Sequence, residues 1–282
     1  MQIFQGDLHI HSSYSDGILA PEDIIRIAES RALNFIGIAD HHCLSGTREA
    51  MRFIEATHSP VEGIWCQEAS CGHQMHLLIL GCKTVHHSID LKRLDEFAAG
   101  IKKEGGALVV AHPWSFFFSR KTVAILNDLV REKIVDGLEL MNLAFAGDAD
   151  DWEKMLIHYE KNWIDKGLAI LGGSDWHSPR FGHVIGAART YLWADNAGER
   201  SILDAVRKGY CTGGASALLL KESGNWQKTD GILRRIFGKG SGVIYRDGVL
   251  GPEYLVSELM AARENRSRQP DIDFNRLKRY YY

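Results

Sequence analysis

Short apolar segments alternate with longer amphipathic ones over the first three quarters of this 282-residue chain. The apolar segments predict strands over residues 3–9, 35–38, 64–66, 75–80, 107–110, 137–140, 168–171 and 187–193. The amphipathic segments predict helices over residues 21–32, 46–56, 91–103, 122–132, 151–166 and 200–208. This alternation favours an α/β fold with parallel strands and right-handed crossovers. A TIM-like barrel and an open doubly wound sheet both satisfy it.

The composition changes after residue 216. Residues 217–282 carry a net charge of +4 and residues 1–216 a net charge of −7, against −3 for the whole chain. We therefore expect one barrel domain over residues 1–216. Residues 217–282 are expected to form a basic C-terminal extension, either packed on the barrel or present as a tail.

The overall composition excludes several classes of protein. Hydrophobic residues make up 45% of the chain and charged residues 24%, values typical of a soluble globular enzyme. No apolar run approaches the roughly 18 residues of a membrane span, and the first residues lack the pattern of a signal peptide. The five scattered cysteines contain no CxxC pair, which predicts reduced thiols and a cytoplasmic protein.

Clusters of histidine and acidic residues follow the first two predicted strands. His9 and His11 are two positions apart in a strand, so both imidazoles point to one side and can reach one cation. Asp16, before Gly17, is either a further ligand or a turn residue. After the second strand, His41 is favoured over His42 as the inward-pointing ring. The preceding Asp40 either orients a histidine ligand or caps the next helix.

Three more clusters follow later strands. Glu68 ends one strand, with His76 at the start of the next, and its carboxylate either bridges two cations or makes a hydrogen bond across the mouth of the barrel. His112 lies at the tip of the strand over 107–110, where Pro113 ends it. Asp175 and His177 alternate after the strand over 168–171 and so share a side.

These clusters together predict a multinuclear metal site. Parallel barrels and open sheets build their sites where strands end, and buried acids and imidazoles are costly unless they are paired or coordinated. Mixed histidine and carboxylate ligands suit Zn, Mn or Fe, and the absence of cysteine argues against a structural zinc site. The number of ligands implies two or three divalent ions. The predicted metal ligands are His9, His11, Asp16, His41, Glu68, His76, His112, Asp175 and His177.

These motifs resemble those of the PHP family, the polymerase and histidinol phosphatase superfamily. Residues 7–17 are similar to its opening motif, and residues 39–42, Glu68, 111–113 and 174–177 occur in the family's order. Residues 135–142 resemble its strand that ends in an acidic residue and Asn. The similarity spans about residues 3–210. It implies a distorted TIM-like (βα)7 barrel with up to three ions at the mouth where its strands end.

The resemblance also implies how the ligands are shared. One ion would be held by His9, His11, Glu68 and Asp175. A second would be held by Glu68, His76 and His112, with His73 close enough to compete with His76. Asp16, His41 and His177 would hold the third.

A site of this kind predicts hydrolysis of a phosphate ester by metal-activated hydroxide. The candidate catalytic residues are Asp175, His177, His41 and Glu68, with either His177 or His41 protonating the leaving oxygen.

Four further residues are candidates for binding the substrate. Arg180 offers a guanidinium fork that matches phosphate, unless it is an exposed loop arginine. Trp114 either stacks on a ring of the substrate or packs in the core. Asn142, like Glu139, lines the pocket or braces ligands, and His42 is placed to alter substrate contacts.

The leading hypothesis is a phosphoesterase of a small phosphorylated metabolite or nucleotide. The alternative is an exonuclease or oligoribonuclease acting on short nucleic acids, which the basic extension with Tyr280–Tyr282 supports. A third, less favoured hypothesis is a metal-stabilised interaction module without turnover.

Overall fold

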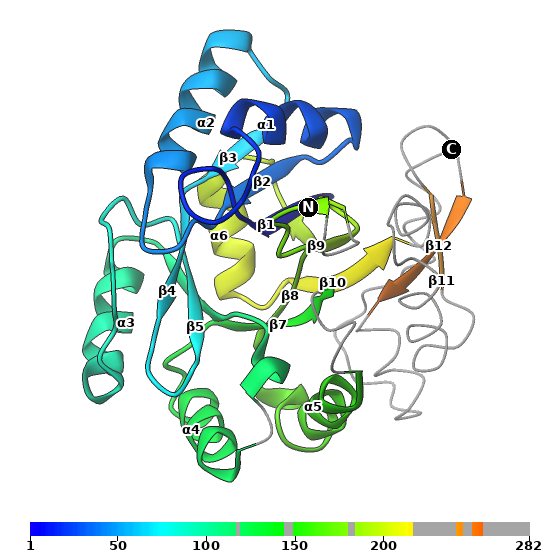
Figure 1. Cartoon of the computed structure of the whole chain (residues 1–282). Helices are drawn as coiled ribbons and strands as arrows, with labels where there is room; N and C mark the ends of the chain where they lie inside the picture. Colours follow the sequence, from blue (N-terminus) through cyan, green and yellow to red (C-terminus); the bar gives the residue numbers. More distant parts are fainter. Residues whose placement is uncertain (117–118, 144–148, 180–183, 217–240, 245–249, 256–282) are drawn as a thin grey trace.

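The computed structural model describes residues 1–116, 119–143, 149–179, 184–216, 241–244 and 250–255 (Figure 1). The helices are α1 (Pro21–Ser30), α2 (Ser45–Thr57), α3 (Leu94–Lys103), α4 (Arg120–Arg131), α5 (Ala149–Asn162) and α6 (Glu199–Arg207). The strands are β1 (Gln2–Ile10), β2 (Phe35–Ile38), β3 (Glu62–Ile64), β4 (Cys66–Ser70), β5 (His76–Leu80), β6 (Ala107–Val110), β7 (Gly137–Asn142), β8 (Ala169–Gly173), β9 (Ala188–Ala194), β10 (Cys211–Ser216), β11 (Ser241–Ile244) and β12 (Leu250–Leu255).

The strands form two sheets, which confirms the predicted α/β class. One sheet has the order β11-β12-β10-β9-β1-β2-β3 and the other the order β4-β5-β6-β7-β8. The predicted closed (βα)7 barrel is not what the hydrogen bonding shows, since no ladder joins the two sheets among the described strands. The repeated βα unit is also interrupted, because β4 and β5 pair antiparallel without a crossover helix and β9 pairs antiparallel with both β1 and β10.

The two sheets nevertheless approach closely where β8 lies beside β9 and β10. A Cβ atom on Gly213 would lie 2.4 Å from the carbonyl oxygen of Leu171, and one on Gly172 would lie 2.3 Å from that of Arg189. Thr190 links the backbones, because its hydroxyl donates to the Gly172 carbonyl (2.9 Å) and accepts from the Gly172 amide (3.0 Å). Glycine at both positions is therefore required for this contact, which we call the sheet seam.

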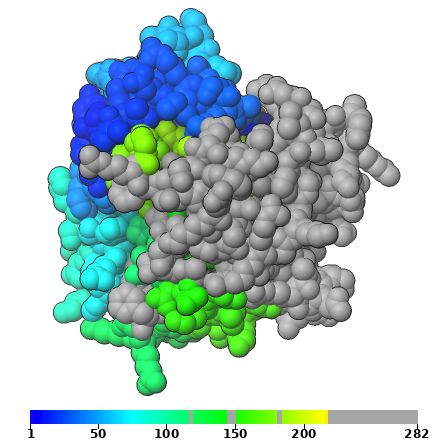
Figure 2. All heavy atoms as spheres, turned by 45° about the vertical axis from the view of Figure 1, so that its right-hand side comes forward, coloured from blue at the N-terminus to red at the C-terminus, as the bar shows by residue number. Residues whose placement is uncertain are grey.

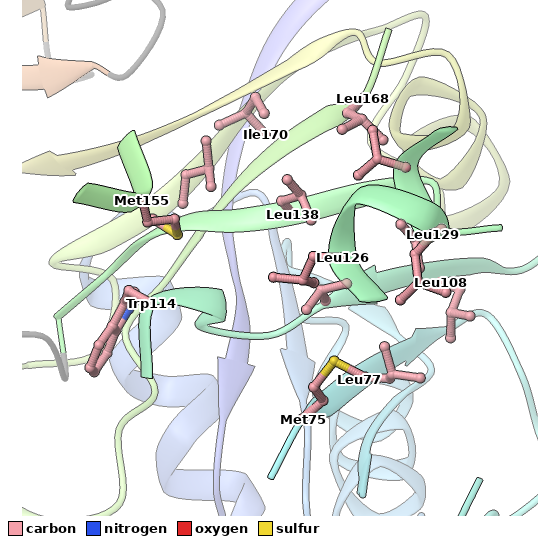
Figure 3. Close-up of a cluster of buried hydrophobic side chains, with 14 of the residues drawn as sticks. Met75, Leu77, Leu108, Trp114, Leu126, Leu129, Leu138, Met155, Leu168 and Ile170 are labelled. Carbon is pink, nitrogen blue, oxygen red and sulfur yellow. The ribbon is translucent and has the colours of Figure 1, made fainter. Parts of the chain in front are cut away.

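Amphipathic helices cover the sheets. In α1, Pro21 opens the helix and Ile24, Ile25 and Ala28 are buried on one face, as expected for a surface helix. Figure 2 shows the residues of α1 and α2 along the top of one face and those around α5 along the bottom. The largest apolar cluster includes Leu77, Leu126 and Leu138, which lie together between the five-stranded sheet and α4 (Figure 3).

The described part of the C-terminal extension joins the seven-stranded sheet. Strand β12 pairs antiparallel with β10, and Gly214 lies opposite Leu255. The rest of residues 217–282 falls outside the described residues, so the boundary at residue 216 stays a prediction. None of the helices described is both long enough and apolar enough to cross a membrane.

Candidate metal centre

The structure brings the nine predicted ligands to one end of the strands. His9 lies on β1, Glu68 on β4 and His76 at the start of β5. The others lie in the segments that follow β1, β2, β6 and β8. Their donor atoms form four overlapping groups, each within 4.8 Å, that could hold a metal ion. These groups are His11/Asp16/His41/His177, His9/His112/Asp175, His9/His11/Glu68 and Glu68/His76/His112.

Glu68 lies at the centre of these groups and is 1% exposed. Its Oε2 lies 3.3 Å from the Nε2 atoms of His9 and His11 and 3.3 Å from Nδ1 of His41. Its Oε1 lies 2.9 Å from Nδ1 of His76 and 3.0 Å from Nε2 of His112. One carboxylate thus faces two sets of imidazoles, the arrangement expected of a ligand that bridges two cations.

The backbone places Glu68 in this position. Residues His41 and Glu68 form an isolated parallel bridge, and the amide of His42 donates to the Glu68 carbonyl over 3.0 Å. His42 adopts a left-handed conformation with φ +52°. The end of β2 is therefore tied directly to β4, across the gap between the two sheets.

Asp175 and Asp16 complete the site on its other sides. Asp175 Oδ1 lies 3.3 Å from Nε2 of His9 and 3.4 Å from Nε2 of His11. Asp16 Oδ2 lies 3.6 Å from Nε2 of His41 and 3.4 Å from Nε2 of His177. The side chain of Asp16 is 54% exposed, whereas His9 and His11 are buried, so the site opens to solvent on the Asp16 side.

The donor set fits divalent cations. The Nε2 atoms of His9 and His11 and the Nδ1 atom of His76 are buried and have no hydrogen-bond partner, although each lies close to a carboxylate. A buried polar atom without a partner costs about 1–3 kcal/mol. Cations held between these nitrogens and the carboxylates would satisfy all three.

Burial and the neighbouring charged groups shift the pKa values of several side chains in the site. Burial acts to lower the pKa of His11, but the nearby carboxylates of Asp175 and Glu68 raise it to about 9. Burial likewise opposes the charged form of Glu68, yet His9 and the other imidazoles bring its pKa well below the usual range. The pKa of His41 is lowered, chiefly by burial. The Glu68 carboxylate is thus held ionised, as a ligand for a cation must be.

Asp40 fills neither of its two predicted roles. Its buried carboxylate accepts hydrogen bonds from the amide and hydroxyl of Ser12 and from the hydroxyl of Ser15, each at 2.7 Å. No side chain caps α2. Asp40 therefore orders the turn between His11 and Asp16 rather than orienting a histidine or capping a helix.

Asp7 is a residue of the site that the sequence did not single out. Its fully buried carboxylate accepts from the amides of His9 (3.2 Å), Ser174 (3.0 Å) and Gly186 (2.8 Å). Burial raises its pKa to about 6. Asp7 thereby ties the end of β1 to the segments on either side of the Asp175 loop. The available signal was an acidic residue inside the first predicted strand, two positions before His9.

The predicted substrate-binding residues have different environments. The Trp114 side chain is 4% exposed within the largest apolar cluster, and Asn142 is fully buried. His42 is half-buried, with Nε2 3.4 Å from the Ser70 hydroxyl. Arg180 lies outside the described residues. Contact of all four with substrate stays a prediction.

Of the two histidines that compete as ligands, His76 lies beside Glu68. His73 is exposed, in the turn that precedes β5. The geometry therefore supports the predicted ligand His76.

Comparisons with known proteins agree with this architecture. No family model matches the chain. A solved two-domain protein from Bacteroides vulgatus, described as containing a predicted PHP-like metal-dependent phosphoesterase, superposes with a TM-score of 0.55 at 18% identity, over 75% of this chain and 64% of that one. This chain therefore has the fold of the PHP-like metal-dependent phosphoesterases. The resemblance to the PHP family is confirmed at the level of the fold.

Two curated relatives match shorter segments. A 3',5'-nucleoside bisphosphate phosphatase from Chromobacterium violaceum is 34% identical over 76 residues, 27% of this chain and 27% of that protein. A 5'-3' exoribonuclease from Haemophilus influenzae is 32% identical over 83 residues, 28% of this chain and 30% of that protein. The matches thus span less than a third of either relative.

Proposed function

We propose that this chain is a metal-dependent phosphoesterase that hydrolyses a small phosphorylated metabolite or nucleotide at a site of two or three divalent ions. The observation that carries the proposal is the position of Glu68, whose two oxygens lie 2.9–3.3 Å from five imidazole nitrogens. The PHP-like fold supports it. Zn, Mn and Fe are the proposed metals because the ligands combine imidazoles with carboxylates.

When bound, such ions lower the pKa of a water molecule toward neutrality and stabilise charge on phosphoryl oxygens. The protein itself holds the nine proposed ligands in fixed positions relative to one another. Glu68 and Asp175 form the buried floor, with His9 and His11 against both. Asp16, His41 and His76 lie nearer the solvent, where a substrate would enter.

The geometry distinguishes the roles open to His177. Its Nδ1 lies 2.9 Å from the Asp175 carbonyl oxygen, which accepts only if Nδ1 carries the proton. Its Nε2 then presents a lone pair toward the Asp16 side of the site, 3.4 Å from that carboxylate. We therefore assign His177 to holding a cation rather than to protonating the leaving oxygen. His41 faces carboxylates through both ring nitrogens and is assigned the same role.

Metal analysis combined with a screen of phosphate esters tests the proposal. The purified protein, reconstituted with Mn, Fe or Zn, should retain stoichiometric metal and hydrolyse at least one mono- or bisphosphorylated ester. Asp175→Asn should lower turnover by at least about a thousandfold, because a bound metal ion contributes several kcal/mol to catalysis.

The matched control is Asp195→Asn. The Asp195 carboxylate is 83% exposed and follows β9 at the opposite end of β1 from the site. It should leave turnover unchanged. A protein that retains no metal after reconstitution, or an Asp175→Asn variant with normal activity, contradicts the proposal. Metal binding that stabilises the fold without turnover on any ester would favour the interaction module.

A nuclease acting on short nucleic acids is the second candidate. It is favoured by the match to the H. influenzae exoribonuclease and by the net charge of +4 over residues 217–282. Contacts between basic residues and a phosphate backbone release counterions, so binding of an oligonucleotide weakens steeply with salt. Activity that falls with salt on oligonucleotides but not on mononucleotides would select the nuclease. Equal salt dependence on both substrates would select the small-molecule phosphoesterase.

A further inference from the structure

Glu139 is a buried acid that none of the proposed ligand sets uses. It lies in the middle of β7 and is 1% exposed. Both of its carboxylate oxygens lie 3.0 Å from Nδ1 of His9. Its Oε2 also accepts from the backbone amide of His112 (3.0 Å) and from the side-chain amide of Asn142 (2.9 Å).

We propose that Glu139 is a positioning residue for the metal centre, and this inference rests on the metal-dependent function proposed above. A carboxylate at Nδ1 keeps the proton on that nitrogen, so the lone pair of His9 lies on Nε2. Nε2 is the atom that faces Glu68 and Asp175, each at 3.3 Å. Glu139 therefore selects the tautomer and the ring orientation in which His9 can hold a cation.

The contacts of Glu139 separate this role from that of a ligand. Its hydrogen-bond partners come from the ring, the backbone and a side-chain amide, and they occupy the acceptor sites that a ligand would turn toward a cation. Glu139 also belongs to none of the four groups of donors within 4.8 Å found among the described residues. Glu139 therefore contacts the candidate ligands His9 and His112 without facing a cation itself.

Through Asn142, Glu139 also reaches a second ligand. The Asn142 amide lies 2.9 Å from Glu139 Oε2 and 3.4 Å from Asp175 Oδ2. His112, whose amide Glu139 holds, has a φ of +27°, a conformation that L residues rarely adopt. One carboxylate thus connects His9, His112 and Asp175, which come from three different parts of the chain.

The neighbouring strand is shaped to admit this carboxylate. On β8, a Cβ atom added to Gly173 would lie 2.3 Å from Glu139 Oε1 and 2.6 Å from Cβ of His9. Glycine at this position leaves the space that the Glu139–His9 pair occupies. Gly173→Ala is therefore a second way to disturb the pair without removing the carboxylate.

Glu139→Gln tests the proposal with little change of shape. A glutamine has one acceptor oxygen where the carboxylate has two, so at least one of the three donors loses its partner. We expect metal affinity, measured by competition with a chromophoric chelator, to fall about 10–100-fold, the usual effect of losing a carboxylate behind a histidine ligand. Gly173→Ala should lower it in the same direction, and Glu139→Asp should recover part of the loss.

The control is Glu132→Gln, since that carboxylate is 58% exposed and follows α4 on the surface. It should leave metal affinity unchanged. Unchanged metal affinity in folded Glu139→Gln overturns the proposal.

Nitrogen NMR of the metal-loaded wild-type protein tests the proposal without a variant, so it does not depend on whether a variant folds. His9 should carry its proton on Nδ1, and a proton on Nε2 overturns the proposal. A wild-type protein that binds no metal at all contradicts the proposed function instead, so the two failures are distinguishable.

Discussion

At the scale of single residues, the site depends on buried carboxylates that do not face the proposed cations. Asp7, Asp40 and Glu139 are all buried, and each accepts hydrogen bonds from groups that position the ligands. Such groups cost free energy to bury unless their acceptors are used. Asp7, Asp40 and Glu139 therefore help to hold the backbone and rings of the candidate ligands in place.

Asp7→Asn is predicted to destabilise the protein in a way that depends on pH. The amide retains one acceptor for the three backbone donors, so we expect a loss of about 1–3 kcal/mol. Burial raises the folded pKa of Asp7 to about 6, against about 4 in the unfolded chain. The stability that this raised pKa confers is complete below pH 4 and is lost as the pH rises through 6.

The wild-type protein should therefore exceed Asp7→Asn in stability by more at pH 4 than at pH 7. A shift of two pKa units corresponds to about 3 kcal/mol. Urea unfolding of both proteins in chelator at the two pH values measures the difference without a contribution from metal. A gap that is larger at pH 7 would show that Asp7 is instead stabilised as a carboxylate.

The candidate ligands could be picked out from the sequence, whereas the contacts made by the residues that support them could not. His9 and His11, or Asp175 and His177, are visible as local pairs because the strand period places two side chains on one side. Two of the three donors to Asp7, the amides of Ser174 and Gly186, are 167 and 179 positions away. Contacts of that range depend on how the sheets meet, which no local pattern encodes.

At the scale of elements, the sheet seam is the critical contact. Gly213→Ala would place a methyl group 2.4 Å from the backbone oxygen of Leu171, which cannot move as a flexible side chain does. We expect a loss of about 1–3 kcal/mol, the usual cost of overpacking a close-packed interior. Thermal or urea unfolding measures it, and a variant as stable as the wild type would show that β8 and β10 can separate freely.

Gly100→Ala, in contrast to Gly213→Ala, is predicted to increase the stability of the protein. Gly100 is exposed within α3, and a Cβ atom there meets nothing within 4 Å. Alanine is preferred over glycine in a helix interior by about 1 kcal/mol, so the variant should be more stable by about that amount. A destabilised Gly100→Ala would contradict the open space that the structure shows around this position.

Periodicity predicted all six helices and most strands up to β9, but it missed β10, β11 and β12 and did not show how the strands pair. The segment over 64–66 was expected as one strand, but the structure divides it between β3 and β4. Strand β4 then pairs with β5 as an antiparallel hairpin. The turn between them depends on positive φ at Gly72, His73 and Gln74, and only the first of these is glycine. The predicted closed barrel required a crossover here, so the error followed from turn geometry rather than from the apolar pattern.

At the scale of the whole molecule, negative charge is concentrated in residues 1–216, and part of it is buried in the candidate site. Residues 1–216 carry a net charge of −7, and the buried Glu68 and Asp175 lie together within the site. Cations should therefore stabilise the fold as well as complete the site. Binding at a concentration one hundred times the dissociation constant adds about 2.7 kcal/mol of stability. Calorimetry should show a melting temperature that rises with Mn²⁺ or Zn²⁺ in wild type and rises less in Asp175→Asn.

The cysteines give a test of burial across the whole chain. Cys43 is half-buried, whereas Cys66, Cys71, Cys82 and Cys211 are 0–6% exposed. Burial also raises the pKa of Cys71 and Cys211 to about 12, so almost no reactive thiolate is present at pH 8. A chromogenic disulfide reagent should therefore label one thiol per native chain rapidly and all five after unfolding. Cys43→Ser should abolish the rapid phase, and two or more rapid thiols in the native protein would show that these sheets open far more readily than their packing indicates.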